Sequence, residues 1–197
     1  MSNEINVESS GLAVVVTFAR PESRNPLSVS VLEQLHRLVD DVSGDAGVER
    51  LVFTGAGDVF ASGADLREIA VVTADGAREF AIRGQALTSK LATMPQPAIA
   101  AVNGICFGGA LDLALACRVR IASGDALFSH PGSGLGIITG WGGTQRLPRL
   151  VGEAAALEMF FTGKRVGARQ ALAIGLIDAI ADDPLAAALI FEIQITV

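Results

Sequence analysis

Two adjacent glycines and one carboxylate lie close together in an otherwise apolar stretch of the chain, Val102–Cys117. From Ala110 onward the stretch predicts a buried helix, with Gly108 and Gly109 at its start and Asp112 in its first turn. The free N–H groups at a helix N-terminus attract negative charge, and glycine lets a ligand approach the backbone closely. We therefore expect the Gly109 N–H and the Asp112 carboxylate to face one small volume, as a donor beside a base. The alternative is that Asp112 only complements the helix dipole.

A second segment, DVFASGADLREI, places another backbone donor at a strand-to-helix transition. The N–H of Ala64 lies just before the short helix that follows Asp65. Two N–H groups aimed at one point, here those of Ala64 and Gly109, would form an oxyanion hole. Such a hole stabilises the enolate of a thioester or the tetrahedral intermediate of acyl transfer. Asp65 and Glu68 have the spacing of a capping box, which leaves Glu68 open to a capping or a catalytic role.

The glycine motifs, the net charge and the cysteine spacing argue against several other kinds of site. No GK[ST] follows Gly104–Gly109, and the run GxxxGG differs from the dinucleotide-binding pattern GxGxxG. The net charge of −6 and the lack of a basic cluster argue against a nucleic-acid partner. Cys106 and Cys117 have neither CxxC spacing nor a nearby histidine pair, so we expect reduced core thiols. No metal or redox cofactor is indicated.

The elements that must position these residues alternate between strand-like and helix-like segments, which predicts an α/β protein of one domain, 1–197. Half of the 197 residues are hydrophobic and 18% are charged, as in a protein with a large core. Apolar or β-branched runs predict strands at Leu12–Ala19, Arg50–Gly55, Ala98–Gly104 and Val119–Ser123. Helical spacing predicts helices around Val31–Val39, from about Asp75 to Ala92 with Thr73 as N-cap, after Asp65, and in GEAAALEMFFTG and GARQALAIGLIDAIA. His36 falls off the apolar face of the first of these helices, so we expect it in solvent.

The ends of the chain and its most apolar region bear on location. MSNEINVESSG has the pattern of neither a signal peptide nor a transit peptide, and Leu91–Ala122 is too often interrupted to span a bilayer. We therefore expect a cytoplasmic protein without a membrane partner. The chain stops in an apolar run, where Ile193, Thr196 and Val197 would leave apolar surface uncovered unless a partner or missing residues cover it.

Several segments, taken together, resemble the enoyl-CoA hydratase/isomerase (crotonase) family. They are FASGADLREI, AAVNGICFGGALDLALACRVRIAS, RPESRNPLS, GWGGTQRLPRLVG and FTGKRVGARQALAIGLIDAI, which occur in the family's order from about Gly11 to Ile180. The resemblance implies a β-spiral of repeated strand–strand–helix units, an acyl-CoA substrate and a homo-oligomer, either a trimer or a hexamer. Family members usually continue for several more helical turns, so the C-terminal helical extension is expected to be missing or truncated.

The resemblance also implies roles for individual residues. Ala64 and Gly109 match the two oxyanion-hole amides, and Asp112 falls where hydratases of the family carry their first catalytic glutamate. The residues that match the substrate site are Ser23, Asn25, Leu27, Ala61, Ser62, Asp65, Leu66 and Gly132, with Trp141 packing against or lining the acyl pocket.

The chain departs from the family where the second catalytic glutamate would stand. The segment FSHPGSGLG places Gly132 at that position, and Gly140 at the position of an aspartate found in some isomerases. Asp112 is also one methylene shorter than glutamate, or about 1.5 Å. His130 could face the same pocket as position 132 and supply a second group, or it could be a satisfied or surface histidine. Ser133 is a weaker candidate, as a residue that holds a water.

The sequence therefore favours an enoyl-CoA hydratase or isomerase, with a lyase favoured over an isomerase. The oxyanion hole of Ala64 and Gly109 would act with Asp112, and coenzyme A would be part of the substrate. A catalytically weak acyl-CoA-binding protein, and a hydrolase or decarboxylase of CoA thioesters, are the alternatives.

Overall fold

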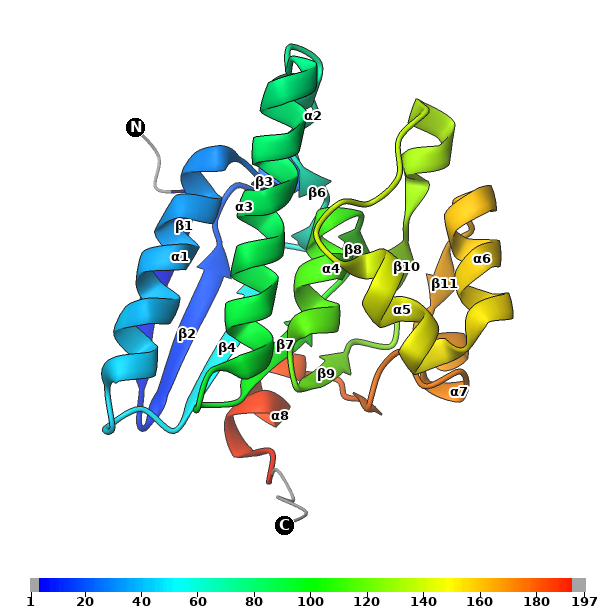
Figure 1. Ribbon diagram of the computed structural model, residues 1–197. Coiled ribbons are helices and arrows are strands. Elements are labelled where there is room, and N and C mark those ends of the chain that lie inside the picture. Colours follow the sequence, from blue (N-terminus) through cyan, green and yellow to red (C-terminus); the bar gives the residue numbers. More distant parts are fainter. Residues whose placement is uncertain (1–3, 193–197) are drawn as a thin grey trace.

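The structure is a computed structural model that describes residues 4–192, and its centre is a six-stranded sheet (Figure 1). Across the sheet the strands are β1 (Ile5–Ser10), β2 (Ala13–Phe18), β4 (Arg50–Gly55), β7 (Ala98–Val102), β9 (Val119–Ala122) and β12 (Ala179–Ile180). β1 and β2 are antiparallel, whereas the other neighbouring strands are parallel. The four strands predicted from apolar runs are β2, β4, β7 and β9, so these predictions are confirmed.

Two smaller sheets are formed by strands that lie between those of the six-stranded sheet in sequence. One has four strands in the order β11 (Val166–Gly167), β10 (Leu127–Ser129), β8 (Ile105–Phe107) and β5 (Val59–Ala61), and another pairs β3 (Pro26–Leu27) with β6 (Gly63–Ala64). β4, β7 and β9 are each followed by a strand of the four-stranded sheet and then by helical segments. This succession confirms the repeated strand–strand–helix units expected from the resemblance.

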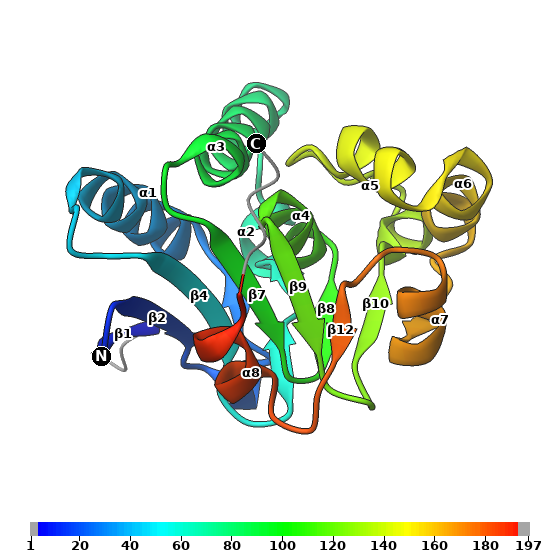
Figure 2. The ribbon, with the colours of Figure 1, turned by 90° about the horizontal axis from the view of Figure 1, so that it is seen from below.

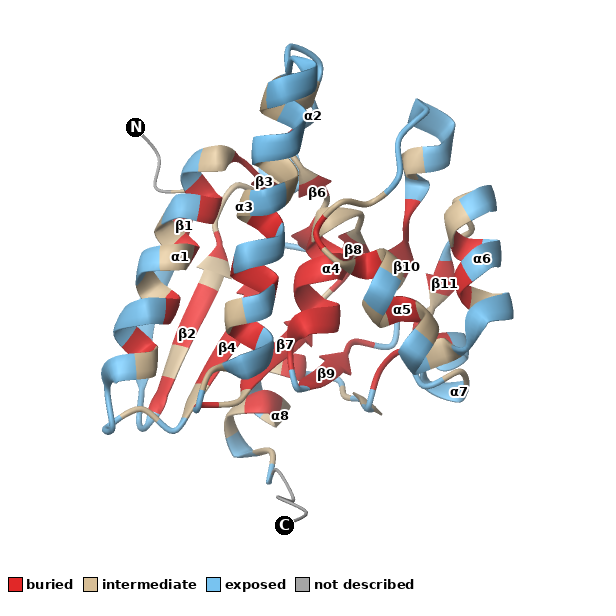
Figure 3. Cartoon of the chain, in the orientation of Figure 1, coloured by how far each residue is buried: buried red, intermediate tan, exposed pale blue. Residues whose placement is uncertain are grey.

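Helices cover both faces of the six-stranded sheet. In the described part of the chain the helices are α1 (Val29–Gly44), α2 (Leu66–Ile69), α3 (Ala74–Thr93), α4 (Gly109–Ala116), α5 (Gly143–Val151), α6 (Glu153–Thr162), α7 (Ala168–Ala173) and α8 (Pro184–Ile190). Only some of them lie on the sheet, and α5 packs beside α4 and α6. Figure 2 shows α1, α3 and α4 on one face and α8 on the other. In α1, a stripe that includes Leu32, Leu35 and Val39 is buried, and each such side chain contributes about 1.5–3 kcal/mol by leaving water. α4 is buried on every side from Ala110 to Ala116, as its apolar sequence predicts (Figure 3).

Some local predictions are confirmed and others need correction. Thr73 caps α3, and Cys106 and Cys117 are free and buried, as predicted. The helix predicted across GARQALAIGLIDAIA is wrong beyond α7, because Gly175 adopts a φ of +77° and the chain then enters β12. The prediction for His36 is also wrong, since its ring is half-buried and its Nε2 lies 3.0 Å from the carbonyl oxygen of Arg83.

The prediction of uncovered apolar surface at the C-terminus concerns residues that the structure does not describe. Residues 193–197, which include Ile193, Thr196 and Val197, lie outside the described residues. Among the residues that are described, no helix is long and apolar enough to cross a membrane.

Asn25 fastens the loop before β3 to the corner between β4 and β5. Its side-chain NH2 donates to the carbonyl oxygens of Ala56 at 3.2 Å, Val59 at 2.7 Å and Phe60 at 3.2 Å. Its Oδ1 accepts the N–H of Arg20 at 2.8 Å, and the residue is only 1% exposed. Asn25 tolerates its φ of +48° because asparagine is one of the few residues that adopt left-handed backbone readily. This side chain therefore holds the fold around the site.

We expect Asn25→Ala to lower the free energy of unfolding by about 3 kcal/mol, because buried carbonyl and N–H groups lose their partners. Urea unfolding followed by circular dichroism measures the change. Gln34→Ala is the matched control, since the Gln34 amide bonds only to Ser30 on the exposed side of α1. The control should change the free energy by less than about 0.5 kcal/mol. Equal effects of the two substitutions would contradict the role given to Asn25.

Candidate functional site

A cavity of about 590 Å³ opens where β6, the start of α4 and the 130–141 segment meet. Its volume is in the range of small-molecule sites. The apolar part of its wall includes Val72, Phe80, Leu135, Ile137 and Ile138. Of the residues predicted from the sequence, the wall contains Ser23, Ser62, Ala64, Asp65, Leu66, Gly109, His130, Gly132 and Trp141. Nine residues from four separate segments are thus brought together.

Ala64 and Gly109, whose N–H groups the sequence predicts to act together, both line this cavity. Leu27 in β3 accepts the N–H of Asp65 at 3.3 Å, so the preceding N–H, that of Ala64, points away from β3. β6 there lies directly against the start of α4, since a Cβ on Gly63 would be 3.0 Å from the Gly109 nitrogen. The Gly109 N–H is among the first of α4, where no intrahelical partner exists. The oxyanion hole expected from these two N–H groups stays a prediction, and the structure places both residues at one cavity.

Trp141 supplies a second reason for the glycine at position 109. A Cβ there would lie 2.4 Å from the indole Cζ3, and a Cβ on Gly84 would lie 2.1 Å from the indole Cδ1. The indole is 3% exposed and meets the Phe80 ring at a centroid distance of 5.3 Å. Gly109 therefore makes room for an aromatic wall as well as for a ligand.

Asp112 lies behind the cavity. The residue is 0% exposed and does not belong to the wall, which corrects the expectation that its carboxylate faces the cavity directly. Its Oδ2 accepts hydrogen bonds from the Thr139 hydroxyl and, at 3.0 Å, from the Trp141 N–H. Burial raises the pKa of Asp112 to about 6, although these hydrogen bonds oppose the change. The carboxylate is therefore enclosed, and it is mostly ionised at neutral pH.

His130 is buried between the cavity and Asp112. Its Nε2 lies 3.6 Å from the Asp112 Oδ1, and neither ring nitrogen has a hydrogen-bond partner within residues 4–192. Burial lowers the pKa of His130 to about 4, so the imidazole is neutral at pH 7. His130 and Gly132 both belong to the wall, but the turn Pro131–Leu135 places Gly132 there rather than a shared strand face.

Gly132 has no room for a side chain. A Cβ there would lie 2.7 Å from the carbonyl oxygen of Ile137, whose own N–H bonds back to the Gly132 carbonyl at 3.0 Å. A carboxylate at position 132 would require this turn to open. Ser133 is exposed and lies outside the wall.

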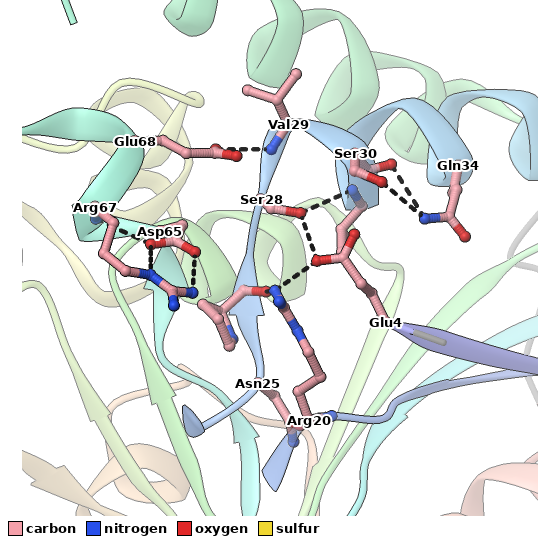
Figure 4. Close-up of polar contacts among 12 residues, drawn as sticks. Glu4, Arg20, Asn25, Ser28, Val29, Ser30, Gln34, Asp65, Arg67 and Glu68 are labelled. Atoms are coloured by element: carbon pink, nitrogen blue, oxygen red, sulfur yellow. Dashed lines mark hydrogen bonds and ion pairs between the residues drawn. The ribbon is translucent and has the colours of Figure 1, made fainter. Parts of the chain in front are cut away.

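Glu68 does not form the predicted capping box, and it lies outside the cavity wall. Asp65 caps α2 by accepting the Arg67 N–H at 2.9 Å, and the hydrogen bonds from the Arg67 side chain hold the pKa of Asp65 below its usual value. The Glu68 carboxylate instead accepts the N–H of Val29 at 2.8 Å (Figure 4). Val29 is distant in sequence and is the first residue of α1. The capping box is therefore wrong, and Glu68 joins α2 to α1.

The other predicted substrate-site residues stand behind the wall. Leu27 and Ala61 are 0% exposed and pack in the core, and Asn25 makes the backbone contacts described above. Thr139, which no sequence motif singles out, also belongs to the wall, and its hydroxyl donates to the carboxylate of Asp112, 27 residues earlier. No spacing signals such a contact. Within the described part of the chain, no three His, Cys, Asp or Glu side chains come close enough to hold a metal ion.

Known proteins resemble this chain over most of its length. Residues 8–189 match the family described as "Enoyl-CoA hydratase/isomerase". A short-chain-enoyl-CoA hydratase of Clostridium acetobutylicum is 38% identical over 91% of this chain and 69% of that protein. A crotonyl-CoA hydratase of Syntrophomonas wolfei is 40% identical over 89% of this chain and 68% of that protein. The crystal structure of an enoyl-CoA hydratase from Bacillus anthracis has a TM-score of 0.90 at 34% identity, over 95% of this chain and 74% of that one.

The raised pKa of Asp112 predicts a pH-dependent difference between the protein and its Asp112→Asn variant. The pKa is about 6 in the folded state against 3.8 ordinarily, so protonation stabilises the folded state and this gain is lost as pH rises from about 4 through 6. The variant should therefore gain about 3 kcal/mol relative to the unchanged protein between pH 4 and pH 7. Urea unfolding of both proteins at each pH measures it. A difference that is constant with pH would contradict the raised pKa.

Proposed function

Because the chain belongs to the enoyl-CoA hydratase/isomerase family, we propose that it adds water to the double bond of a short-chain enoyl-CoA thioester. The observation that carries the proposal is that Ala64 and Gly109, from two separate segments, line one cavity where β6 lies against the start of α4. The names of the relatives, a short-chain-enoyl-CoA hydratase and a crotonyl-CoA hydratase, support the choice of substrate class.

The two N–H groups would act on the thioester carbonyl oxygen. When a nucleophile adds to the β-carbon, negative charge moves to this oxygen and an enolate forms. The N–H groups, with the positive end of the α4 dipole behind Gly109, stabilise that charge more than they stabilise the neutral substrate. One such donor contributes about 3 kcal/mol, or about a hundredfold in rate.

Asp112 would store the proton that the reaction releases. A carboxylate with a pKa of about 6 is ionised at neutral pH and is a stronger base than an exposed aspartate. It takes up a proton when water becomes hydroxide, and the proton returns when the α-carbon of the enolate is protonated. Substrate and water are joined, and the carboxylate ends as it began.

Trp141 would limit the length of the acyl chain. Its indole covers Gly109 and packs against Phe80, so the space beside the carbonyl-binding N–H groups is narrow and apolar. A four-carbon acyl group suits such a space better than a long one.

A second candidate function is acyl-CoA binding with little turnover. The observation that favours it is Gly132, which has neither a carboxylate nor room for one. Hydratases of the family use a second glutamate at this position, so a protein without it has fewer groups to activate water.

An assay of crotonyl-CoA hydration, in which the loss of enoyl absorbance is monitored, tests the proposal. Asp112→Asn should lower kcat/KM at pH 8 by about a hundredfold or more, because the base is lost. The unchanged protein should lose activity as pH falls below about 6, where Asp112 becomes protonated. Calorimetric binding of butyryl-CoA is the control, and it should survive the substitution. Binding without any turnover by the unchanged protein would contradict hydration and favour the second candidate.

Trp141→Ala should shift the substrate preference toward longer chains. The ratio of kcat/KM for 2-octenoyl-CoA to that for crotonyl-CoA should rise at least about tenfold, the usual size of discrimination in an apolar pocket. Phe161→Ala is the control, because Phe161 is 76% exposed on α6 and outside the cavity wall. If kcat/KM falls equally for the two substrates in Trp141→Ala, Trp141 does not set the preferred length of the acyl chain.

A further inference from the structure

The base proposed above is separated from the cavity. Asp112 is fully buried and outside the wall, so a water in the cavity cannot reach its carboxylate directly. Among the described residues of the wall, two side chains lie against the carboxylate oxygens. The Thr139 hydroxyl donates to Oδ2, and the His130 Nε2 lies 3.6 Å from Oδ1. A proton must pass one of these side chains.

We propose that Thr139 is a catalytic residue whose hydroxyl passes a proton between a water in the cavity and Asp112. The inference rests on the proposed function, hydration of an enoyl-CoA thioester. It assigns the missing second group of the site to a side chain 27 residues from Asp112 in sequence.

The proton transfers balance over one reaction cycle. The Thr139 oxygen accepts a proton from water while its own proton moves to the Asp112 Oδ2. The resulting hydroxide bonds to the β-carbon, and the electron pair of the double bond moves through the α-carbon to the carbonyl oxygen. The proton on Asp112 then returns to the Thr139 oxygen while the Thr139 proton passes to the α-carbon. Water has been added, and both side chains are restored.

The hydrogen-bond geometry favours Thr139 over His130. A hydroxyl has one proton and two lone pairs, and the proton of Thr139 already points at Asp112. The Thr139 hydroxyl therefore accepts a hydrogen bond from a water in the cavity. A lone pair of that water then points away from Thr139 and is free to attack the β-carbon. The Asp112–His130 pair, in contrast, is longer than a hydrogen bond, and burial lowers the pKa of His130 to about 4.

The contact between the Thr139 hydroxyl and the Asp112 carboxylate requires a glycine at position 143. A Cβ on Gly143, the first residue of α5, would lie 2.0 Å from the Asp112 Oδ1 and 2.9 Å from the Thr139 Cγ2. The missing side chain at position 143 therefore leaves the space in which the hydroxyl and the carboxylate meet.

The test compares Thr139→Val, which keeps the shape and removes the hydroxyl, with Thr139→Ser, which keeps the hydroxyl. Crotonyl-CoA hydration is measured across pH, with butyryl-CoA binding and urea unfolding as checks on the site and the fold. On the plateau near pH 8.5, kcat should fall about a hundredfold in Thr139→Val and stay within about fivefold of the unchanged protein in Thr139→Ser.

The pH profile separates proton transfer from mere positioning of Asp112. The Thr139 hydrogen bond lowers the pKa of Asp112, so its removal should move the acid limb to higher pH. His130, Arg146 and Cys106 also face Asp112 and are unchanged in both variants. A Thr139→Val protein with the full plateau and only a shifted acid limb would overturn the proposal.

Two further outcomes are also decisive. If Thr139→Val fails to fold or to bind butyryl-CoA, Thr139→Ala replaces it, because a smaller side chain adds no contact, and the same plateau loss is expected. If the unchanged protein binds butyryl-CoA but does not hydrate crotonyl-CoA at any pH, the proposed function fails and the proton transfer through Thr139 fails with it. That result differs from an active Thr139→Val, which overturns the role of Thr139 alone.

Discussion

The burial of one carboxylate, that of Asp112, sets the arrangement of the site. An ionised carboxylate without water is unstable unless donors surround it, and here the Thr139 hydroxyl and the Trp141 N–H serve that purpose. These contacts draw the 139–143 segment onto the first turns of α4. Trp141 then lies over Gly109, and Gly143 must lack a side chain. The Trp141 indole at Gly109 and the enclosed carboxylate are therefore held by the same contacts.

This arrangement separates the groups that the proposed reaction would use. Ala64 and Gly109 line the cavity, whereas the Asp112 carboxylate lies outside its wall, behind Thr139. Burial raises the pKa of Asp112 to about 6 and also keeps its carboxylate away from the cavity. Thr139 belongs to the cavity wall and donates to the Asp112 Oδ2, so the proposed proton transfer links the two places through it. The close turn at Gly132 leaves no room for an acidic side chain at that position.

The sequence predicted those parts of the fold and site that depend on local pattern. The strand Arg50–Gly55 was predicted with its observed bounds, because an apolar run between turn residues specifies a buried strand. Small residues at strand-to-helix transitions pointed to Ala64 and Gly109, which both line the cavity. Contacts between distant segments could not be predicted in this way. Glu68 bonds to Val29 across the molecule, and Thr139 reaches Asp112 from a loop without periodicity. The burial of Asp112 also depends on packing from several segments, which no single motif encodes.

A crystal structure with bound acetoacetyl-CoA would show whether the substrate carbonyl meets two N–H groups while Asp112 stays behind Thr139. We expect the thioester oxygen at about 2.7–3.1 Å from the nitrogens of both Ala64 and Gly109. We also expect the Thr139 hydroxyl between Asp112 and the β-carbon. A thioester oxygen bound elsewhere in the cavity, or an Asp112 carboxylate in direct contact with the ligand, would rule out this arrangement.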